Sequence, residues 1–497
     1  MRRVLAVLAV WVLLAVPTWY ALFTHDHAPV VIASHDAVVT PTLDHYARVT
    51  MGPYLPDLRR RTDNRIGVRI DLGKTIATSD RELIARYGLI ASHPDAEIRQ
   101  VTREVREQLL ESAFQAGVVA AVPIAVWFLV GARRRTELLR LDRRKVGVTV
   151  VAVGLVTLAV LTPWRSSTDR VQPTSWIPLA EVLPEVDVPA ELAGVEVQGG
   201  LLTQGTRRLI ASAFQGLAEG KTFYNDLVDK APAAAALVRA PEEGQSIAVM
   251  VSDRHDNIGM DPVVRAIADG VGADAVIDAG DDTSTGEPWE TFSLDSLADA
   301  FRGYSTRVAV AGNHDNGTFV SRYLEGRGWT HLHGTEANLL GVRFFGVDDP
   351  RSSGLGIWKD EKGLSFDQVK SRVADDLCKR DKDGERISTL LVHDANLGRT
   401  ALERGCVDLV IAGHVHIQVG PNRVVGENGK AGYTYTNGTT GGAAYAVAVG
   451  SRLRREGELT FLTFADGRPV GIQPVRISTR GQFLVDPYIA LDLGTAQ

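Results

Sequence analysis

Long apolar runs alternate with polar stretches over the first third of the chain. Residues 4–23 contain no charged side chain, and residues 116–131 and 146–164 have the same character. About 20 helical residues, each rising about 1.5 Å, cross a hydrocarbon core of about 30 Å. The pattern therefore predicts transmembrane helices at residues 1–23, 114–131 and 146–164.

Charges beside these runs predict the orientation of the chain in the membrane. Residues 132–145 hold seven Lys or Arg and two acidic residues, and such a basic loop marks the cytoplasmic side. Arg2 and Arg3 place the N-terminus on the same side. We therefore expect a multi-pass protein of the cell membrane, with residues 24–113 and everything after residue 164 outside the cytoplasm.

Each apolar run has an alternative interpretation. The first, with Arg2 and Arg3 before it, resembles a signal peptide, but no clear A-x-A cleavage site follows. Cleavage there would leave the predicted layout unchanged. The other two runs could be core helices, and the basic loop between them argues against this.

The segments between the apolar runs have weaker patterns. Residues 24–113 contain strand-like stretches at 30–40 and 65–73 and a helical pattern around 95–111, which predicts a small extracytoplasmic α+β or β-rich module. Residues 165–245 are expected to be an extracytoplasmic linker and a helical lead-in, with helices near 202–218 and 223–238.

From Ser246 short apolar runs alternate with helix-like segments, as in α/β folds. Five of these runs end in Asp, His or Asn residues. Because ligands of α/β sheets bind beyond the carboxyl ends of the strands, we expect the five groups to converge on one site. The groups are Asp253 with His255, Asp281 with Asp282, Asn313 with His314 and Asp315, His393 with Asp394, and His414 with His416.

The residue types in these groups favour metal ions. Each group alone has an ordinary interpretation as a turn, a surface pair or a core histidine, but five in succession favour one joint site. Carboxylate, carboxamide and imidazole without thiolate suit Mn, Fe, Zn or Mg-like ions rather than a structural zinc site. Two ions about 3.5–4 Å apart that share a carboxylate are an established arrangement for displacement at phosphorus. Gly280, Gly312 and Gly413 precede three of the groups, and small backbone there lets a turn carry the ligand over the sheet edge.

Composition narrows the class of protein. A chain of 497 residues with 45% hydrophobic and 23% charged residues is ordinary for a globular protein of two or more domains. The net charge of −6 gives no reason to expect dedicated nucleic-acid binding. Cys378 and Cys406 are too few for a disulfide framework. Outside the cytoplasm they could pair, and two buried free thiols are the alternative.

As a set, the motifs D-x-H, G-D, G-N-H-D, a lone His and G-H-x-H resemble the calcineurin-like metallophosphoesterase superfamily over about residues 246–465. The resemblance implies a four-layer α/β/β/α sandwich at residues 246–497, preceded by the transmembrane helices and the small module. It also implies two divalent or mixed-valence metal ions, Mn, Fe or Zn, at the strand ends. The first ion would be held by Asp253, His255, Asp281 and His416, and the second by Asp281, Asn313, His393 and His414.

The same resemblance implies roles in the reaction. A hydroxide shared by the two ions would attack phosphorus in line. His314 would act at the leaving group as a general acid or charge stabiliser, and Asp315 would orient His314.

Two positions depart from the family pattern. Asp256 stands where the family usually has Gly, and Asp282 stands where an apolar residue is more usual. Asp256 is a candidate second layer around the ligands, and Asp282 is either such a group or an exposed side chain. The second motif also lacks the Asp-Arg-Gly ending of the serine/threonine phosphatase branch, which argues against that activity. No predicted ligand is lost.

The sequence therefore predicts a membrane-anchored, dinuclear-metal phosphoesterase that hydrolyses phosphomonoesters or phosphodiesters on the extracytoplasmic side. Its partners would be the phosphoester substrate and the lipid bilayer, which three helices would cross. The alternative is a non-catalytic envelope sensor or binding protein that uses the same metal site.

Several weaker features stay open at this point. Residues 437–445 are either a hairpin turn or a Gly-rich loop whose backbone contacts the substrate. Arg351 is a candidate phosphate contact. The pair His331 and His333 is expected to be structural or exposed, and the pair His25 and His27 to lie on the surface.

Overall fold

The computed structural model describes residues 2–32, 35–51, 56–63, 65–75, 87, 95–131, 133–135, 175–185, 188, 192–199, 204–354, 357–359, 363–443 and 452–494. The chain divides into two compact units, one of residues 1–76 and 94–211 and one of residues 77–93 and 212–497. The predicted transmembrane helix at 146–164 and most of the basic loop at 132–145 lie outside the described residues.

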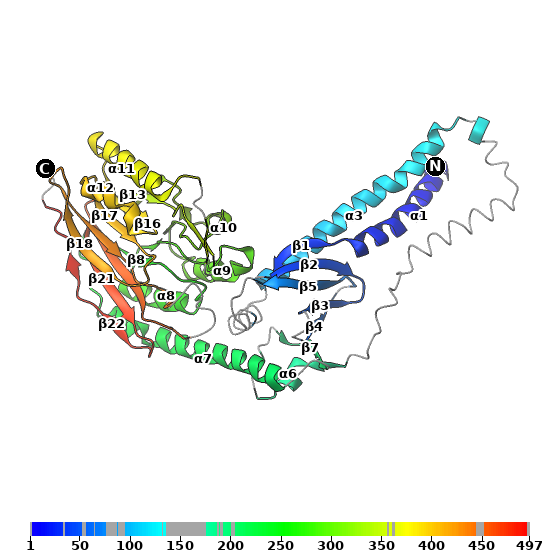
Figure 1. The fold of residues 1–497 in the computed structure, drawn as a ribbon, viewed down its shortest axis with the longest axis horizontal. Coiled ribbons are helices and arrows are strands. Elements are labelled where there is room, and N and C mark those ends of the chain that lie inside the picture. Colours follow the sequence, from blue (N-terminus) through cyan, green and yellow to red (C-terminus); the bar gives the residue numbers. More distant parts are fainter. Residues whose placement is uncertain are drawn as a thin grey trace. The chain divides into compact units, whose positions relative to one another are not determined.

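The first unit contains a pair of long helices, α1 (Arg2–His25) and α3 (Asp95–Leu129), which lie side by side (Figure 1). The indole Nε1 of Trp11 in α1 donates a hydrogen bond to the carbonyl oxygen of Gly117 in α3, at 3.0 Å. Within these helices, the segments Val4–His25 and Glu97–Leu129 are long enough to cross a membrane, and each contains an 18-residue window with a mean hydropathy of 2.1 and 1.8, respectively. They contain the first two predicted transmembrane helices, and α3 joins the second to the helix expected around 95–111.

The rest of the first unit is a seven-stranded sheet with strand order β1-β2-β5-β3-β4-β7-β6. Its last two strands come from the segment that the sequence pattern marks as a linker. Strands of three and four residues are too short for a periodic pattern to identify, so this pairing could not be predicted. The strands are β1 (Ala28–Ile32), β2 (His35–Thr42), β3 (Tyr46–Thr50), β4 (Leu58–Arg61), β5 (Gly67–Thr75), β6 (Trp176–Pro178) and β7 (Val195–Gln198), and the short helix α6 (Leu179–Val182) follows β6.

The second unit contains two larger sheets. The eight-stranded sheet has strand order β11-β10-β9-β8-β20-β21-β22, with β23 beside β21, and the six-stranded sheet has strand order β12-β13-β16-β17-β19-β18. The strands of the first are β8 (Gln245–Val251), β9 (Ala275–Asp278), β10 (Thr306–Ala309), β11 (Thr330–His331), β20 (Gly457–Ala465), β21 (Arg468–Ile477), β22 (Phe483–Val485) and β23 (Ile489–Ala490). Those of the second are β12 (Thr335–Leu339), β13 (Val342–Val347), β16 (Ile387–Val392), β17 (Val407–Ala412), β18 (Val419–Val425) and β19 (Ala431–Thr436), and β14 (Ser352–Gly354) and β15 (Ile357–Lys359) form a separate hairpin.

Helices cover the outer faces of the two sheets, so the second unit has the four-layer arrangement that was expected (Figure 1). Side chains such as Met250 and Ile411 fill the space between the sheets. Every residue of β16 and β17 is buried, as expected for parallel strands covered on both faces. The helices are α7 (Gln204–Ala235), α8 (Met260–Val271), α9 (Thr291–Ala300) and α10 (Phe319–Gly326) on one side, and α11 (Phe366–Lys382) and α12 (Arg399–Glu403) on the other, with short 3-10 turns η3 (Pro288–Glu290) and η4 (Ala395–Leu397).

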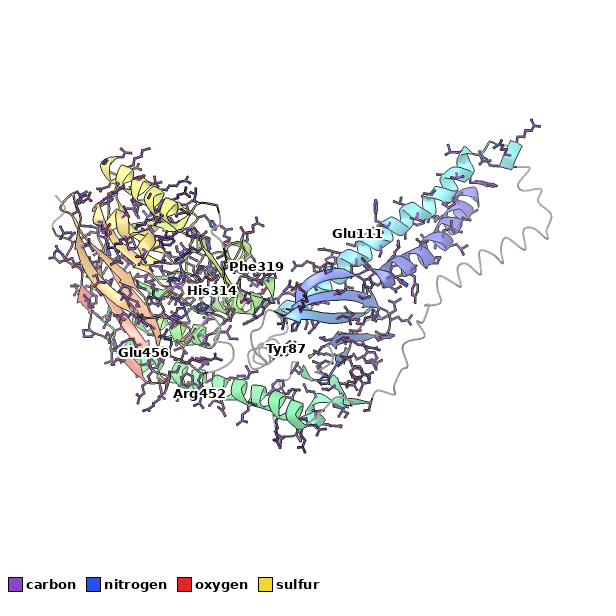
Figure 2. The ribbon with its side chains drawn as sticks, viewed as in Figure 1. Tyr87, Glu111, His314, Phe319, Arg452 and Glu456 are labelled. Carbon is purple, nitrogen blue, oxygen red and sulfur yellow. A yellow bond between two sulfur atoms is a disulfide. The ribbon has the colours of Figure 1, made fainter. Side chains whose placement is uncertain are left out.

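Helix α7 is one continuous helix where the sequence pattern predicts two. Its apolar side chains Tyr224, Leu227 and Ala231 are buried against the eight-stranded sheet and α8. Arg452 lies beside α7 (Figure 2), with its guanidinium 4.0 Å from the Glu219 carboxylate. The polar residues between the two predicted helices therefore face away from the core without interrupting the backbone.

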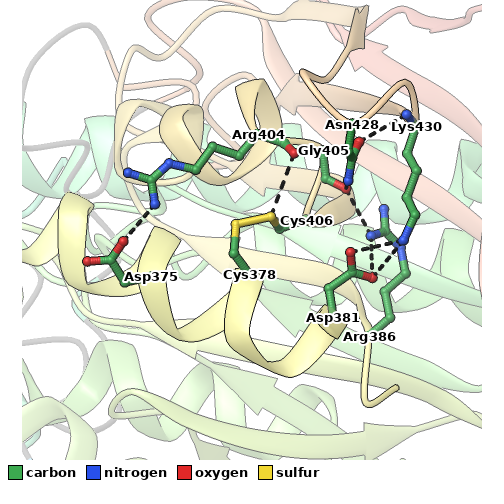
Figure 3. Close-up of a disulfide and its surroundings, with 9 residues drawn as sticks. All are labelled: Asp375, Cys378, Asp381, Arg386, Arg404, Gly405, Cys406, Asn428 and Lys430. Atoms are coloured by element: carbon green, nitrogen blue, oxygen red, sulfur yellow. Dashed lines mark hydrogen bonds and ion pairs between the residues drawn. A yellow bond between two sulfur atoms is a disulfide. The ribbon is translucent and has the colours of Figure 1, made fainter. Parts of the chain in front are cut away.

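Cys378 and Cys406 form a disulfide, with their Cα atoms 4.9 Å apart (Figure 3). Cys378 belongs to α11, and Cys406 immediately precedes β17. The bond therefore ties a covering helix to the strand that leads to His414 and His416. Of the two alternatives from the sequence, pairing is the one found.

We predict that replacing both cysteines by Ala lowers the free energy of unfolding of this unit by about 3–4 kcal/mol, because the bond closes a loop of 28 residues. Denaturant unfolding of the full chain in detergent measures this loss. Reduction of the wild-type protein should have the same effect on the unfolding midpoint. An unchanged midpoint in both experiments would show that the bond contributes nothing to stability.

Candidate metal centre

The predicted metal ligands converge beyond the carboxyl ends of parallel strands in the second unit. One donor atom from each of Asp253, His255, Asp281 and His416 lies within 4.8 Å of the others, and the same is true of Asp281, His393 and His414. Asp281 belongs to both groups and lies 1% exposed. The strands that lead to these ligands are β8, β9, β10, β16 and β17, each where the sequence predicts an apolar run.

Asn313, the remaining predicted ligand, lies in the loop after β10. Its side-chain Nδ2 donates to Ser353 Oγ at 2.6 Å, while its buried Oδ1 has no hydrogen-bond partner among the described residues. The backbone N–H of the next residue, His314, donates to Asp281 Oδ1 at 2.8 Å. The loop is thus fastened to Asp281 and leaves a carboxamide oxygen available to a cation.

The ligand loops adopt a backbone conformation that few side chains tolerate. Five ligands have left-handed φ, a conformation that costs free energy in non-glycine residues and clusters at functional sites. The loops are held in this conformation by the surrounding fold. The angles are 52° for Asp253, 44° for His255, 60° for Asp281, 78° for His414 and 59° for His416.

Two of the glycines noted in the sequence are required by close approach. A Cβ on Gly312 would collide with Asp281 Oδ1, and a Cβ on Gly413 would collide with Asp253 Oδ2. Any other residue would push a ligand carboxylate out of position.

Backbone contacts fix which imidazole nitrogen is available to a metal. His393 Nδ1 lies 2.7 Å from the Ala279 carbonyl oxygen, and His416 Nδ1 lies 3.1 Å from the Ala443 carbonyl oxygen. A carbonyl accepts only, so each Nδ1 carries the proton and each Nε2 presents a lone pair. This arrangement is common among histidines that ligate metals.

The available lone pairs point at one another. His393 Nε2 lies 3.1 Å from Asp281 Oδ2, and His416 Nε2 lies 3.3 Å from Asp253 Oδ1 and 2.9 Å from His255 Nε2. Acceptor facing acceptor is repulsive unless a cation or proton lies between them. The donor set and its orphaned Asn313 oxygen therefore fit two divalent cations that share Asp281.

The electrostatics of the site follow from burial and mutual contact. Burial lowers the pKa of His255 to about 3, which keeps this imidazole neutral and able to bind a cation. Burial acts to raise the pKa of Asp281, but His393 and then His314 hold it well below its ordinary value. Asp281 is therefore an ionised carboxylate at neutral pH.

His314 lies beside this donor set, with its ring centroid 5.1 Å from that of His255. Its Nδ1 is 3.0 Å from the Ser284 carbonyl oxygen, and Ser284 Oγ donates to Asp256 Oδ2 at 2.5 Å. Asp256 therefore supports the loop that orients His314, which is a second-layer position of the kind expected for it.

Among the described residues, Asp315 contacts backbone N–H groups and the Thr283 hydroxyl rather than the imidazole of His314. Its carboxylate accepts from the N–H groups of Asp281 at 2.7 Å, Gly312 at 3.0 Å and Thr283 at 3.1 Å. The expectation that Asp315 orients His314 is therefore corrected. Asp315 joins the loop after β9 to the loop after β10, and Ser284 orients the imidazole.

Asp282 is buried, and its partner was missed by the sequence interpretation. The guanidinium of Arg254 is fully buried and bonds Asp282 at 2.9 Å and Asp261 at 2.6 and 2.8 Å. Burial raises the pKa of Asp282 to about 6. The sequence does contain a signal for this partner, because in D-R-H an arginine lies between two predicted ligands. The chain must be buried there, so the charge of the arginine needs acidic counterions.

Two further features noted in the sequence, the Gly-rich loop and Arg351, form defined contacts. In the Gly-rich loop, the N–H groups of Thr440 and Gly441 donate to the carbonyl oxygens of Ser252 and Asp253, at 2.8 and 3.2 Å. These amides hold the D-x-H strand end in place. Arg351 forms ion pairs with Asp349 and Asp394 at 2.6 and 2.7 Å.

Comparison with known proteins identifies this domain. Residues 249–418 match the family of calcineurin-like phosphoesterases, so the chain contains a calcineurin-like phosphoesterase domain. The family is one of enzymes that hydrolyse phosphoester bonds. No curated protein matches the chain.

Solved structures similar to the chain cover about half of it. NAD nucleotidase of Haemophilus influenzae is 15% identical over 50% of this chain and 50% of its own, with a TM-score of 0.31. An archaeal phosphodiesterase is 14% identical over 49% of this chain and 99% of its own, with a TM-score of 0.27. A sulfate thiohydrolase of Thermus thermophilus is 12% identical over 51% of this chain and 57% of its own, with a TM-score of 0.29. The chain thus spans about half the length of the nucleotidase.

We predict that Arg254→Met destabilises the domain by about 3–5 kcal/mol, because Asp261 and Asp282 would stay buried without their counterion. Denaturant unfolding measures the loss. Arg302→Met is the matched control, since Arg302 pairs with Asp299 on the surface and its side chain is 72% exposed. A loss for Arg254→Met no larger than that of the control would contradict the buried ion-pair account.

Proposed function

We propose that this protein is a membrane-anchored phosphoesterase with a dinuclear metal centre, which hydrolyses phosphomonoesters or phosphodiesters on the extracytoplasmic side. The observation that carries the proposal is the sharing of Asp281 by two groups of ligands. One group would hold the first ion through Asp253, His255, Asp281 and His416, and the other would hold the second ion through Asp281, Asn313, His393 and His414.

Metal ions such as Mn, Fe or Zn would lower the pKa of a bound water and neutralise phosphoryl oxygens. The side chains of the protein would place those ions and the phosphorus. Asp281, ionised and held by the backbone N–H of His314, fixes the point between the two groups. His393 and His416 keep their lone pairs aimed at that point because backbone carbonyls hold their Nδ1 protons.

His314 is the candidate group for the leaving oxygen. It is half-buried beside His255, and the Ser284 carbonyl fixes its orientation through Nδ1. The carbonyl holds a proton on Nδ1, so in the imidazolium form Nε2 carries a second, transferable proton. A proton donated there would stabilise the alkoxide or phenolate that departs.

Next to this histidine the surface offers room for a substrate group. A hollow of about 560 Å³ is lined by residues that include Asn316, Phe319, Arg322 and Tyr323. Asn316 is two residues from His314. The lining holds two aromatic rings, one cation at Arg322 and one anion at Glu287, so it suits a leaving group with an apolar part.

The sheet of the first unit supports the proposed topology. Leu58–Arg60 pair antiparallel with residues 195–197, so β4 and β7 must lie on the same side of any membrane. The second predicted transmembrane helix lies between them in sequence. The chain would have to cross back before β6, as the apolar run at 146–164 predicts.

A non-catalytic sensor that uses the same metal site is the second candidate. The domain's family is that of phosphoester hydrolases, and the presence of His314 beside the complete donor set favours turnover. The two candidates differ in one measurement, which is hydrolysis by the purified protein.

We predict that the full chain in detergent, loaded with Mn or Zn, hydrolyses p-nitrophenyl phosphate or its bis(p-nitrophenyl) diester. Asp281→Ala should lose at least about 100-fold in kcat, since even residues that only support metal ligands are worth about 10–100-fold. Asp299→Ala, at an exposed ion pair, is the matched control. An inert wild-type protein would favour the sensor, and unchanged turnover in Asp281→Ala would contradict the shared-carboxylate assignment.

We predict that His314→Gln keeps its bound metal but loses about 10²- to 10⁴-fold in kcat. The loss should be larger for an alkyl phosphate than for a p-nitrophenyl phosphate, because an alkoxide needs the proton more than a nitrophenolate does. Steady-state rates with both substrates and metal analysis of the same samples test this. Equal losses in kcat for the two substrates would show that His314 does not donate the proton to the leaving group.

We predict that a reporter fused after Gln497 is exported, whereas the same reporter fused after Lys145 stays in the cytoplasm. Protease treatment of intact cells distinguishes the two fusions, because only an exported reporter is accessible to the protease. A cytoplasmic reporter at Gln497 would refute the proposed topology.

A further inference from the structure

A third group of metal-binding side chains lies outside the dinuclear centre. One donor atom from each of His331, His333 and Asp348 lies within 4.8 Å of the others. His331 ends β11, and Asp348 follows β13, so the group joins one strand from each large sheet. The sequence interpretation placed His331 and His333 in a structural or surface role.

His331 is buried without the hydrogen bonds that an imidazole needs. Its side chain is 0% exposed, and neither Nδ1 nor Nε2 has a hydrogen-bond partner among the described residues. A buried polar atom left in this state costs about 1–3 kcal/mol. Burial also lowers the pKa of His331, which keeps the ring neutral and able to offer a lone pair.

The other two members of the group complete an accessible donor set. The rings of His331 and His333 are stacked, with centroids 4.3 Å apart. His333 Nδ1 and Asp348 Oδ2 form a hydrogen bond of 2.6 Å, which a cation bound to both side chains would replace, and His333 Nε2 lies 3.6 Å from the carboxylate of Glu325. The His333 side chain is 43% exposed, so an ion can reach the group from solvent.

We propose that His331, His333 and Asp348 bind a third divalent cation, separate from the two of the dinuclear centre. Two imidazoles and one carboxylate suit Zn²⁺ and leave a fourth position for water or for Glu325. Mg²⁺ and Ca²⁺ prefer sets made of oxygen donors alone, which this group is not. The ion would supply the partner that the buried His331 lacks.

The site would stabilise a loop of the dinuclear centre. Asp348 Oδ1 accepts from the backbone N–H of Ala311 at 2.7 Å, and the N–H of Asp349 donates to the Ala311 carbonyl at 3.0 Å. Ala311 is followed by Gly312 and by Asn313. A cation on Asp348 would therefore fix the start of the loop that carries Asn313 and His314.

Metal stoichiometry tests this proposal without relying on turnover. Untagged full-length protein in detergent is dialysed to equilibrium against buffered ZnCl₂, and bound zinc is measured by mass spectrometry. We expect wild type to bind one zinc more per chain than His333→Ala and one more than Asp348→Asn. This difference is independent of the proposed function, because it is expected whether or not the dinuclear centre is loaded. Asp281→Ala should lose zinc from the dinuclear centre and keep the ion that His333→Ala removes.

The matched control removes another pair of histidines with the same spacing. His25 and His27 are exposed, and the double replacement by Ala should leave the zinc content equal to that of wild type. His333 is largely exposed and Asp348→Asn keeps an oxygen for the Ala311 N–H, so both variants should fold, which circular dichroism checks. Equal zinc content in wild type, His333→Ala and Asp348→Asn would overturn the proposal, as would loss of the extra ion in the His25 and His27 double variant.

Discussion

The convergence of anionic and lone-pair donors on Asp281 is the constraint on which this domain depends. Asp281 is buried, ionised and shared by two groups of ligands. In the absence of cations, its carboxylate faces the lone pair of His393 at 3.1 Å. That repulsion is relieved only by a positive charge between the two atoms, either a proton on His393 Nε2 or a metal ion, because backbone carbonyls hold the Nδ1 protons. The fold holds together a set of groups that is stable only around positive charge, which is how a metal site is prepared before the metal binds.

The residues around the ligands hold the ligand loops in place against this repulsion. Asp315 accepts hydrogen bonds from backbone N–H groups of two ligand loops. Arg254 forms an ion pair with Asp282, the residue that follows the shared Asp281. The Gly-rich loop closes on the D-x-H strand end, and the disulfide fastens α11 to the strand that leads to the last histidine pair. The left-handed backbone of five ligands is tolerated because these contacts hold the loops in that conformation.

The ligands could be predicted from sequence for a simple reason. Parallel strands end at the same edge of a sheet, so polar residues directly after five apolar runs must meet there. Hydropathy likewise located α1 and the apolar half of α3, because length and composition alone define such helices. Arg254 and Asp315 could not be assigned, since their partners are set by loop packing. The pairing of β7 with β4 joins segments far apart in sequence through strands too short to show a period, and the Cys378–Cys406 bond depends on a distance that sequence does not contain.

The most direct test of the central claim is the distance between the two ions. X-ray absorption spectroscopy on the full chain, loaded with two equivalents of Mn or Zn, reports whether each ion has a metal neighbour. A shared Asp281 predicts a metal–metal distance of about 3.5–4 Å in wild type and the loss of that distance in Asp281→Ala. A wild-type spectrum with nitrogen and oxygen neighbours but no metal neighbour would contradict the dinuclear account.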